Sequence, residues 1–223
     1  MVPRRQPAYR SVAFGLIVIL FAGATLAGRA GAAANAGDFL VSFGQRAVKE
    51  INDASLSEAE RERRFRELLN EAVDLPAIGK FILGPHWRRA TAQERTDFLA
   101  VFEDIALQRF LPMFTRQSDE YTGKSFDIVE VRRAEKNREH IFVRAEVARE
   151  QGAPVRLIWR IRERDNRFKI LDISAEGLSM ALTLRQEYNS AIKRTGGVGG
   201  LIALLREKVK AGAFAPKAKR GTQ

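Results

Sequence analysis

The sequence predicts an α+β fold in which a layer of helices packs on a four-stranded antiparallel sheet. Two patterns support this prediction. Between residues 125 and 174, apolar residues alternate with polar ones, as in half-buried strands, whereas on both sides of this stretch they recur at helical spacing. The expected strands also follow one another through short turns, and consecutive hairpins favour an antiparallel meander.

The strand pattern is clearest after residue 154. Four apolar residues alternate there with arginines, namely Val155, Leu157, Trp159 and Ile161. The pair Asp165-Asn166 predicts a turn, because both residue types tolerate the backbone angles of a tight hairpin. Residues 168–174 then form the returning strand. Residues 140–149 alternate in the same way, and residues 125–133 do so less regularly.

Four helices are expected before the sheet and two after it. Each of the first four is opened by a residue that is favourable at an N-cap, namely Asp38, Ser57, Asp74 and Thr91. Gly84-Pro85 should end the third helix, and Pro112 should end or kink the fourth. After the sheet, a helix containing Leu178 and Leu182 stops at Gly196-Gly197, and a last helix opens at Gly199-Gly200.

The first 36 residues are predicted to be a cleaved secretory signal peptide. Three arginines lie near the start, residues 12–27 are apolar, and small residues with A-x-A spacing follow at 30–36. An uncleaved membrane anchor is the alternative, but an apolar run of about 16 residues is short for a span of about 20. We expect a single domain over residues 37–210 and a basic flexible tail over residues 211–223.

Charge and composition narrow the expected partners. The chain has a formal net charge of +11 and no cysteine. Four arginines and no acidic residues lie in the first 36 positions, which leaves 11 − 4 = +7 on the remainder. In an exported protein this charge favours a phospholipid headgroup or an acidic protein surface, and we expect no nucleic-acid partner. Without cysteine, the fold must rely on its apolar core and cannot carry a thiolate site.

Residue types typical of catalytic and metal sites are scarce. The two histidines, His86 and His140, lie far apart in the sequence, and there is no serine-hydrolase, phosphate-loop or dinucleotide motif. Asp172 and Glu176 are four residues apart, a spacing that is better explained by the favourable charge at a helix N-terminus than by acid–base catalysis. We therefore predict no enzymatic activity, no metal site and no cofactor.

Two segments go beyond general folding patterns. The first reads F-I-L-G-P-H-W-R-R-A-T at residues 81–91, followed by Q-E-R and by Phe98 and Phe102. The second reads F-K-I-L-D-I at 168–173, followed by E-G-L-S at 176–179. Together they resemble the MlaC family, in which these segments read L-G-x-x-W, then F-x-x-x-F, and W-K-V-Y-D-V-x-x-E-G-I-S. Here Phe and Leu replace the Trp and Tyr that are frequent in the second segment.

The resemblance implies a periplasmic lipid carrier. The MlaC family, also called the toluene-tolerance auxiliary family, consists of phospholipid-binding auxiliary components of an ABC transporter that serves outer-membrane lipid asymmetry. Such a protein holds acyl chains in an apolar cavity enclosed between a curved sheet and helices. It shuttles a phospholipid between the inner-membrane ABC transporter complex and an outer-membrane lipoprotein complex. We expect a monomer, and a related branch of the family is associated with hopanoid lipids instead.

The candidate lipid-binding residues combine the inner strand positions with the helical residues expected to face them. They are Phe81, Ile82, Phe98, Phe102, Ile105, Phe110, Ile141, Val143, Leu157, Trp159 and Ile161. Arg144, Arg156 or Arg160 would meet the headgroup phosphate near the mouth of the cavity. Periodicity identifies an inner face but does not show whether that face is filled or hollow.

Two other hypotheses remain open. An enzyme on a related curved-sheet fold, acting on an apolar substrate, would place a polar group with a shifted pKa at the floor of the cavity. An adaptor with a filled core would act only through its basic surface and would bind no lipid. The identity of a bound lipid would separate these hypotheses from the carrier.

Overall fold

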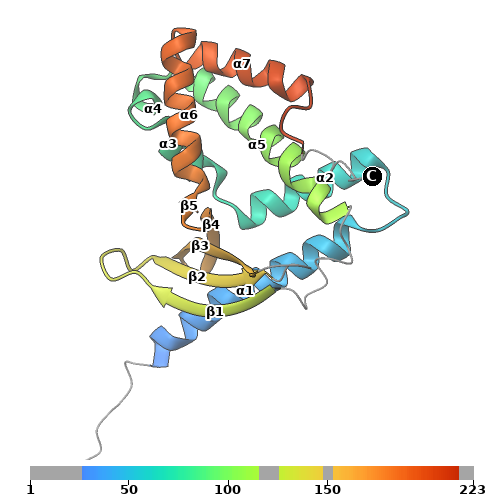
Figure 1. Cartoon of the computed structure of the whole chain (residues 1–223), viewed down its shortest axis with the longest axis vertical. Helices are drawn as coiled ribbons and strands as arrows, with labels where there is room; N and C mark the ends of the chain where they lie inside the picture. The colour runs from blue at the N-terminus through green and yellow to red at the C-terminus, as the bar shows by residue number, and fades with distance from the viewer. Residues whose placement is uncertain (1–26, 116–125, 148–152, 216–223) are drawn as a thin grey trace, which may run out of the picture.

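The computed structural model describes residues 27–115, 126–147 and 153–215 and confirms the α+β class (Figure 1). Within these residues the helices are α1 (Ala27–Ile51), α2 (Glu58–Ala72), α3 (Leu75–Leu83), α4 (Pro85–Arg89), α5 (Ala92–Thr115), α6 (Met180–Thr195) and α7 (Val198–Lys210). The strands are β1 (Phe126–Arg133), β2 (His140–Val147), β3 (Val155–Arg164), β4 (Arg167–Ala175) and β5 (Leu178–Ser179). The predicted signal sequence up to residue 26 and the tail from residue 216 lie outside the described residues.

The sheet has the order β1-β2-β3-β4-β5, and all its neighbours are antiparallel. The predicted four-stranded meander is therefore present, and a fifth strand of two residues extends it where we expected a helix to begin. The turn at Asp165-Asn166 is confirmed, since both residues have positive φ angles, 52° and 57°. A register shift follows Arg160, where β4 carries one extra residue, Leu171, against β3.

One face of the sheet is covered by α1. Ile141, Val143 and Ile161 point into this layer and are fully buried together with Ala36 and Leu40 of α1. The helices α3 and α6 contact β4 and lie on the opposite side of the sheet from α1 (Figure 1). The alternation of the strands thus produces two faces that are covered by different helices.

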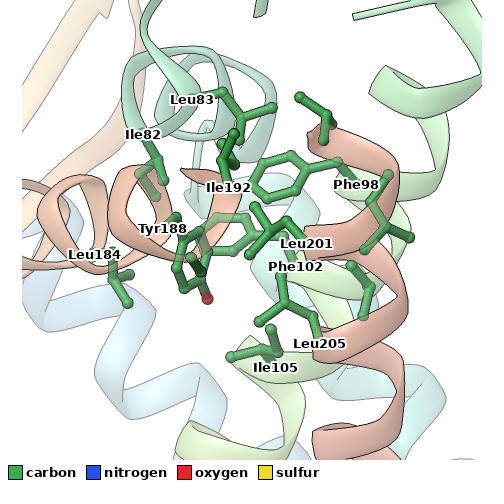
Figure 2. Close-up of a cluster of buried hydrophobic side chains, with 14 of the residues drawn as sticks. Ile82, Leu83, Phe98, Phe102, Ile105, Leu184, Tyr188, Ile192, Leu201 and Leu205 are labelled. Carbon is green, nitrogen blue, oxygen red and sulfur yellow. The ribbon is translucent and has the colours of Figure 1, made fainter. Parts of the chain in front are cut away.

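The second core lies entirely among helices. Figure 2 shows α3, α5, α6 and α7 packed around Phe98, Phe102, Tyr188 and Leu201. The rings of Phe98 and Phe102 are stacked with centroids 5.8 Å apart, and Tyr188 meets Phe98 edge-on at 6.1 Å. Since most side chains of this cluster are buried, these helices form a filled core of their own.

A third, smaller core joins α1, α2 and α5. It contains Ile51, Phe65, Leu68 and Leu107, with Phe110 packed against its border. The stripe of apolar residues predicted on the fourth helix therefore drifts from one core to another, because Phe98 and Phe102 belong to the helical core.

Several helix ends agree with the sequence. Ser57 Oγ accepts a hydrogen bond from the N–H of Glu60, and an Asp74 oxygen accepts one from Ala77. Thr91 and Glu94 form a complete capping box, with each side chain accepting from the other residue's N–H at 3.1 and 2.8 Å. Gly196 ends α6 in the left-handed conformation.

Other helix boundaries differ from the prediction at least in part. Asp38 does not cap the first helix, because the alanine-rich segment from residue 27 is already helical and alanine has the highest helix propensity. Gly84-Pro85 ends α3 but immediately opens α4, as proline fits the first turn of a helix. Pro112 does not end α5, which continues to Thr115 and carries the proline in its interior. The last helix begins at Val198, before the expected pair of glycines.

The predicted end of the signal peptide falls inside α1. Ala36 is fully buried against the sheet, so cleavage after residue 36 would remove one core side chain from this layer. Cleavage and the domain limits at residues 37 and 210 stay predictions. In the described part of the chain, no helix has the length and hydropathy needed to cross a bilayer.

Candidate functional site

The structure distributes the predicted lipid-binding residues over different cores. Ile82, Phe98, Phe102 and Ile105 lie in the helical core, with Phe81 at its border. Ile141, Val143 and Ile161 are buried under α1, and Trp159 packs against the same cluster. Phe110 borders the third core, and Leu157 is half-buried. The expected facing of the strand set and the helical set is thus wrong, because α1 occupies the face to which the strand set points.

A groove is present on the opposite face of the sheet, against α3 and α6. It has a volume of about 270 Å³. We call it the sheet groove, and its lining residues are Phe81, Phe142, Ile158, Arg160, Asp172, Ser174, Ser179 and Leu182. Phe81 is the one member of the predicted lipid-binding set that contributes to it.

The sheet groove leaves apolar side chains in contact with solvent. Ile158 is 37% exposed and Leu182 is 51% exposed, and Leu178, which precedes Ser179, is 75% exposed. By contrast, the strand residues under α1 are buried completely, as at Val143. Adjacent exposed apolar side chains in a concave surface are typical of a binding site for an apolar ligand.

A second hollow meets the sheet groove at Phe81, which lines both. It has a volume of about 490 Å³ and lies between α3, α4 and α6. We call it the basic hollow, and its lining residues are Ala77, Lys80, Phe81, Gly84, Pro85, Trp87, Arg88 and Arg185. None of these residues is acidic, so the basic hollow combines two aromatic rings with three cationic side chains.

Two arginines contact the ring at the junction. The guanidinium carbon of Arg185 lies 4.9 Å from the centroid of Phe81, and that of Arg160 lies 5.7 Å from it. Arg185 Nη1 also donates a hydrogen bond to the carbonyl oxygen of Phe81 at 3.2 Å. Such contacts between a cation and an aromatic face are attractive, and they hold both side chains at the junction.

Asp172 has a structural partner in the groove. Its carboxylate accepts hydrogen bonds from Ser179 Oγ at 2.5 Å and from the N–H of Ala181 at 2.9 Å, and Ser179 caps α6. This arrangement ties β4 to the start of α6. No histidine lines the groove, and no cluster of three or more metal-ligating side chains occurs within the described residues.

Burial and Arg160 affect His140, which lies on β2. Its pKa is lowered from its ordinary value, first by partial burial and then by the positive charge of Arg160. Arg160 therefore acts electrostatically beyond its own strand.

Two other arginines considered for headgroup binding are paired with carboxylates: Arg144 with Glu130 at 3.2 Å, and Arg156 with Glu176 at 3.5 Å.

Comparison with known proteins identifies the family. The family model described as "MlaC protein" matches residues 42–207, which is most of the chain. The chain belongs to the MlaC family. Among solved structures, a phospholipid-binding protein from Ralstonia solanacearum in complex with a phospholipid is similar, with a TM-score of 0.65 and 19% sequence identity. The match covers 79% of this chain and 97% of that one, and it supports the same fold.

The two MlaC-like segments converge at Phe81. The first begins with Phe81 itself, and its Gly84 and Trp87 line the basic hollow. The second supplies Asp172 and Ser179 to the sheet groove. Segments that are about 90 residues apart in the sequence therefore build adjoining parts of one site.

The strand residues of the groove that we did not predict lie on the side of the sheet that also carries Arg160. Phe142 and Ile158 interrupt the polar side of β2 and β3, on which we considered only Arg144, Arg156 and Arg160 as contacts for a ligand. The indication was present in the sequence, because two large apolar residues on a polar phase suggest that this face is also partly covered. Leu182 was recognised as apolar but was assigned to ordinary helix packing.

Proposed function

We propose that this MlaC-family protein is a periplasmic phospholipid carrier whose sheet groove holds acyl chains. The observation that carries the proposal is the open apolar surface formed by Ile158, Leu182 and Phe142 beside Phe81. The similar Ralstonia solanacearum protein binds a phospholipid, which supports a lipid as the ligand. Transfer of hydrocarbon into water costs about 0.8 kcal/mol per methylene, so a lipid crosses an aqueous compartment only if its chains are covered.

The groove must widen to accept its ligand. Its volume of about 270 Å³ is below the roughly 300–1,000 Å³ of typical ligand pockets. Beyond the β4–β5 turn, α6 contacts the sheet at its first turn, where Leu182 is exposed rather than packed. Separation of α3 and α6 from the sheet would enlarge the groove while leaving the filled helical core and the α1 layer intact.

The wider role follows from the family. We propose that the carrier moves its lipid between an inner-membrane ABC transporter complex and an outer-membrane lipoprotein complex, without enzymatic turnover or a cofactor. A hopanoid-type lipid is the alternative cargo, and a groove lined by flexible and aromatic side chains would accept either kind of hydrocarbon.

Native mass spectrometry of the protein from a Gram-negative periplasm tests this function. We expect one lipid per chain, identified after extraction with organic solvent. Leu182→Glu is the decisive variant. Position 182 is three residues after the N-cap Ser179, where glutamate completes a capping box and keeps α6 folded. Its carboxylate would enter the sheet groove and reduce the bound lipid at least tenfold, since a charge buried against acyl chains is strongly unfavourable.

Val129→Glu is the matched control. Val129 is also an exposed apolar residue, but it lies on the edge strand β1 and lines neither hollow. This variant should retain the lipid. A wild-type protein without lipid would contradict the proposal and favour the adaptor. Release of hydrolysed lipid, lost in Asp172→Asn, would instead establish the enzyme.

A further inference from the structure

The junction between the two hollows concentrates positive charge. Arg160 and Arg185 share the ring of Phe81, so their guanidinium carbons are no farther apart than the sum of their distances to that ring, 5.7 and 4.9 Å. Lys80 and Arg88 line the basic hollow next to Arg185. Four cationic side chains thus line the two hollows that meet at Phe81.

The four cations lack a carboxylate partner among the described residues. Within the part of the chain that the structure describes, no ion pair links any of the four to a carboxylate, whereas five of the seven other arginines on the sheet are paired. The paired ones are Arg133 with Glu163, Arg144 with Glu130, Arg156 with Glu176, Arg162 with Asp74 and Arg164 with Glu139. Of the sheet arginines without an ion pair in the described residues, Arg132, Arg160 and Arg167, only Arg160 lines the sheet groove.

Arg160 also has a buried donor without an acceptor. Its Nε atom is inaccessible to solvent and makes no hydrogen bond to any described residue. Asp172 is its cross-strand neighbour, but the two oxygens of that carboxylate accept from Ser179 and Ala181 at the start of α6. Since a buried donor favours an acceptor, an anionic ligand at this position would complete the site.

Arg185 is held in position by the backbone of the α3–α4 junction. It donates to the carbonyl of Phe81, and it lies so close to Gly84 that a Cβ atom there would be 3.0 Å from Arg185 Nη2. Gly84 has a φ of 55°, which also favours glycine. The guanidinium is therefore placed before any ligand binds, and this reduces the entropy lost on binding.

Two guanidinium groups that contact the same ring are suited to a phosphate, because their planar forks match its oxygen atoms. We propose that Arg160 and Arg185 bind a phosphate group at Phe81, and that it is the headgroup phosphate of the lipid whose chains occupy the sheet groove. This inference rests on the proposed carrier function. It divides the site into an acyl region on the sheet and a phosphate region at the junction with the basic hollow.

Calorimetric titration of the full chain tests the inference with three probes: dioctanoylphosphatidylglycerol, dioctanoylglycerol and inorganic phosphate. The two lipids share their chains and differ in the phosphate-bearing headgroup. We expect the phospholipid to bind at least tenfold more tightly than dioctanoylglycerol, as charge-assisted hydrogen bonds allow. Arg160→Gln and Arg185→Gln should each weaken phospholipid binding about fivefold or more and weaken dioctanoylglycerol binding much less.

Controls separate a binding role from a structural one. Arg167→Gln changes an exposed arginine at the β3–β4 turn and should bind both lipids as the wild type does. Arg160→Lys keeps the positive charge but loses the planar guanidinium group. Compared with Arg160→Gln, it should recover only part of the preference for the phospholipid over dioctanoylglycerol. Unchanged circular dichroism and melting temperature would show that the glutamine variants are folded.

The outcomes distinguish the two proposals. If neither lipid binds, the carrier function fails. If both lipids bind with equal affinity, or if the glutamine variants lose both lipids equally, the carrier function stands and the phosphate site is contradicted. If inorganic phosphate binds at the two arginines while lipid affinity does not depend on the headgroup, the site takes free phosphate and the headgroup assignment is overturned.

Discussion

The two faces of the sheet are built by the same strands but are completed in opposite ways. On one face, Ile141, Val143 and Ile161 are fully buried beneath α1. On the other, Phe142, Ile158 and Arg160 line a groove that α3 and α6 cover only in part. The first face supplies stability and the second leaves apolar surface available for a ligand. Neighbouring residues on one strand can therefore have unrelated roles.

The largest expected effect is a loss of folding on the α1 face. Val143→Asp would place an unpaired carboxylate in a fully buried position and reduce the free energy of unfolding by about 4 kcal/mol or more. Ile158→Asp lies on the neighbouring strand but on the other face, and it should cost roughly 1 kcal/mol. Equilibrium unfolding in urea measures both. Equal losses would contradict the distinction between the faces.

A pair of phenylalanines tests the same distinction among the helices. Phe98 is fully buried in the helical core, and Phe98→Ala should lower the free energy of unfolding by about 3–5 kcal/mol. Phe81 is half-buried at the junction of the two hollows, and Phe81→Ala should cost roughly 1–2 kcal/mol while releasing bound lipid. Retention of lipid by Phe81→Ala would remove this side chain from the site.

The need for widening predicts that a cross-link would block lipid entry. The chain has no cysteine, so Ile158→Cys combined with Leu182→Cys provides the only two thiols. A short cross-linker added to the empty protein should prevent lipid uptake, and the same treatment of either single variant should not. Normal uptake by the cross-linked protein would show that chains enter elsewhere.

Much of the fold was predictable because local chemistry determines it. Asp165-Asn166 forms its turn, Asp74 caps its helix and Gly196 ends α6, since each requirement is met by neighbouring residues. The strand phases were predictable for the same reason. The assignment of helices to faces was not, because periodicity shows that a strand has two faces but does not show which helix covers each one.

Of the residues predicted for the site, only Phe81 and Arg160, one of three arginines considered for the headgroup phosphate, therefore line the sheet groove. The buried strand phase is the most regular part of the pattern, and its regularity reflects complete coverage by α1 rather than a cavity. The face that carries the sheet groove is less regular, since Phe142 and Ile158 alternate there with charged residues, some of which form ion pairs. Which role an arginine has depends on partners from distant segments, such as Glu130 for Arg144.

The smallest expected effect concerns pH. The pKa of His140 is lowered in the folded protein by burial and by Arg160, so the unfolded chain binds the proton more tightly. The free energy of unfolding should fall as the pH falls from about 6.5 to the pKa of His140 in the folded protein. Above about pH 6.5, His140 should contribute no pH dependence. His140→Gln should remove this part of the dependence in thermal melts. Arg160→Gln should raise the pKa of His140 in an NMR titration, and an unchanged value would contradict the coupling.

The most direct test of the central claim is to map a bound acyl chain. A phospholipid with a photoreactive group on one chain can be loaded into the protein, cross-linked by light and located by tandem mass spectrometry. We predict adducts on Ile158 of β3 and on Leu182 of α6, with Phe142 as a further site. Adducts on α1, at Phe39 or Leu40, would place the chains on the other face of the sheet and contradict the account.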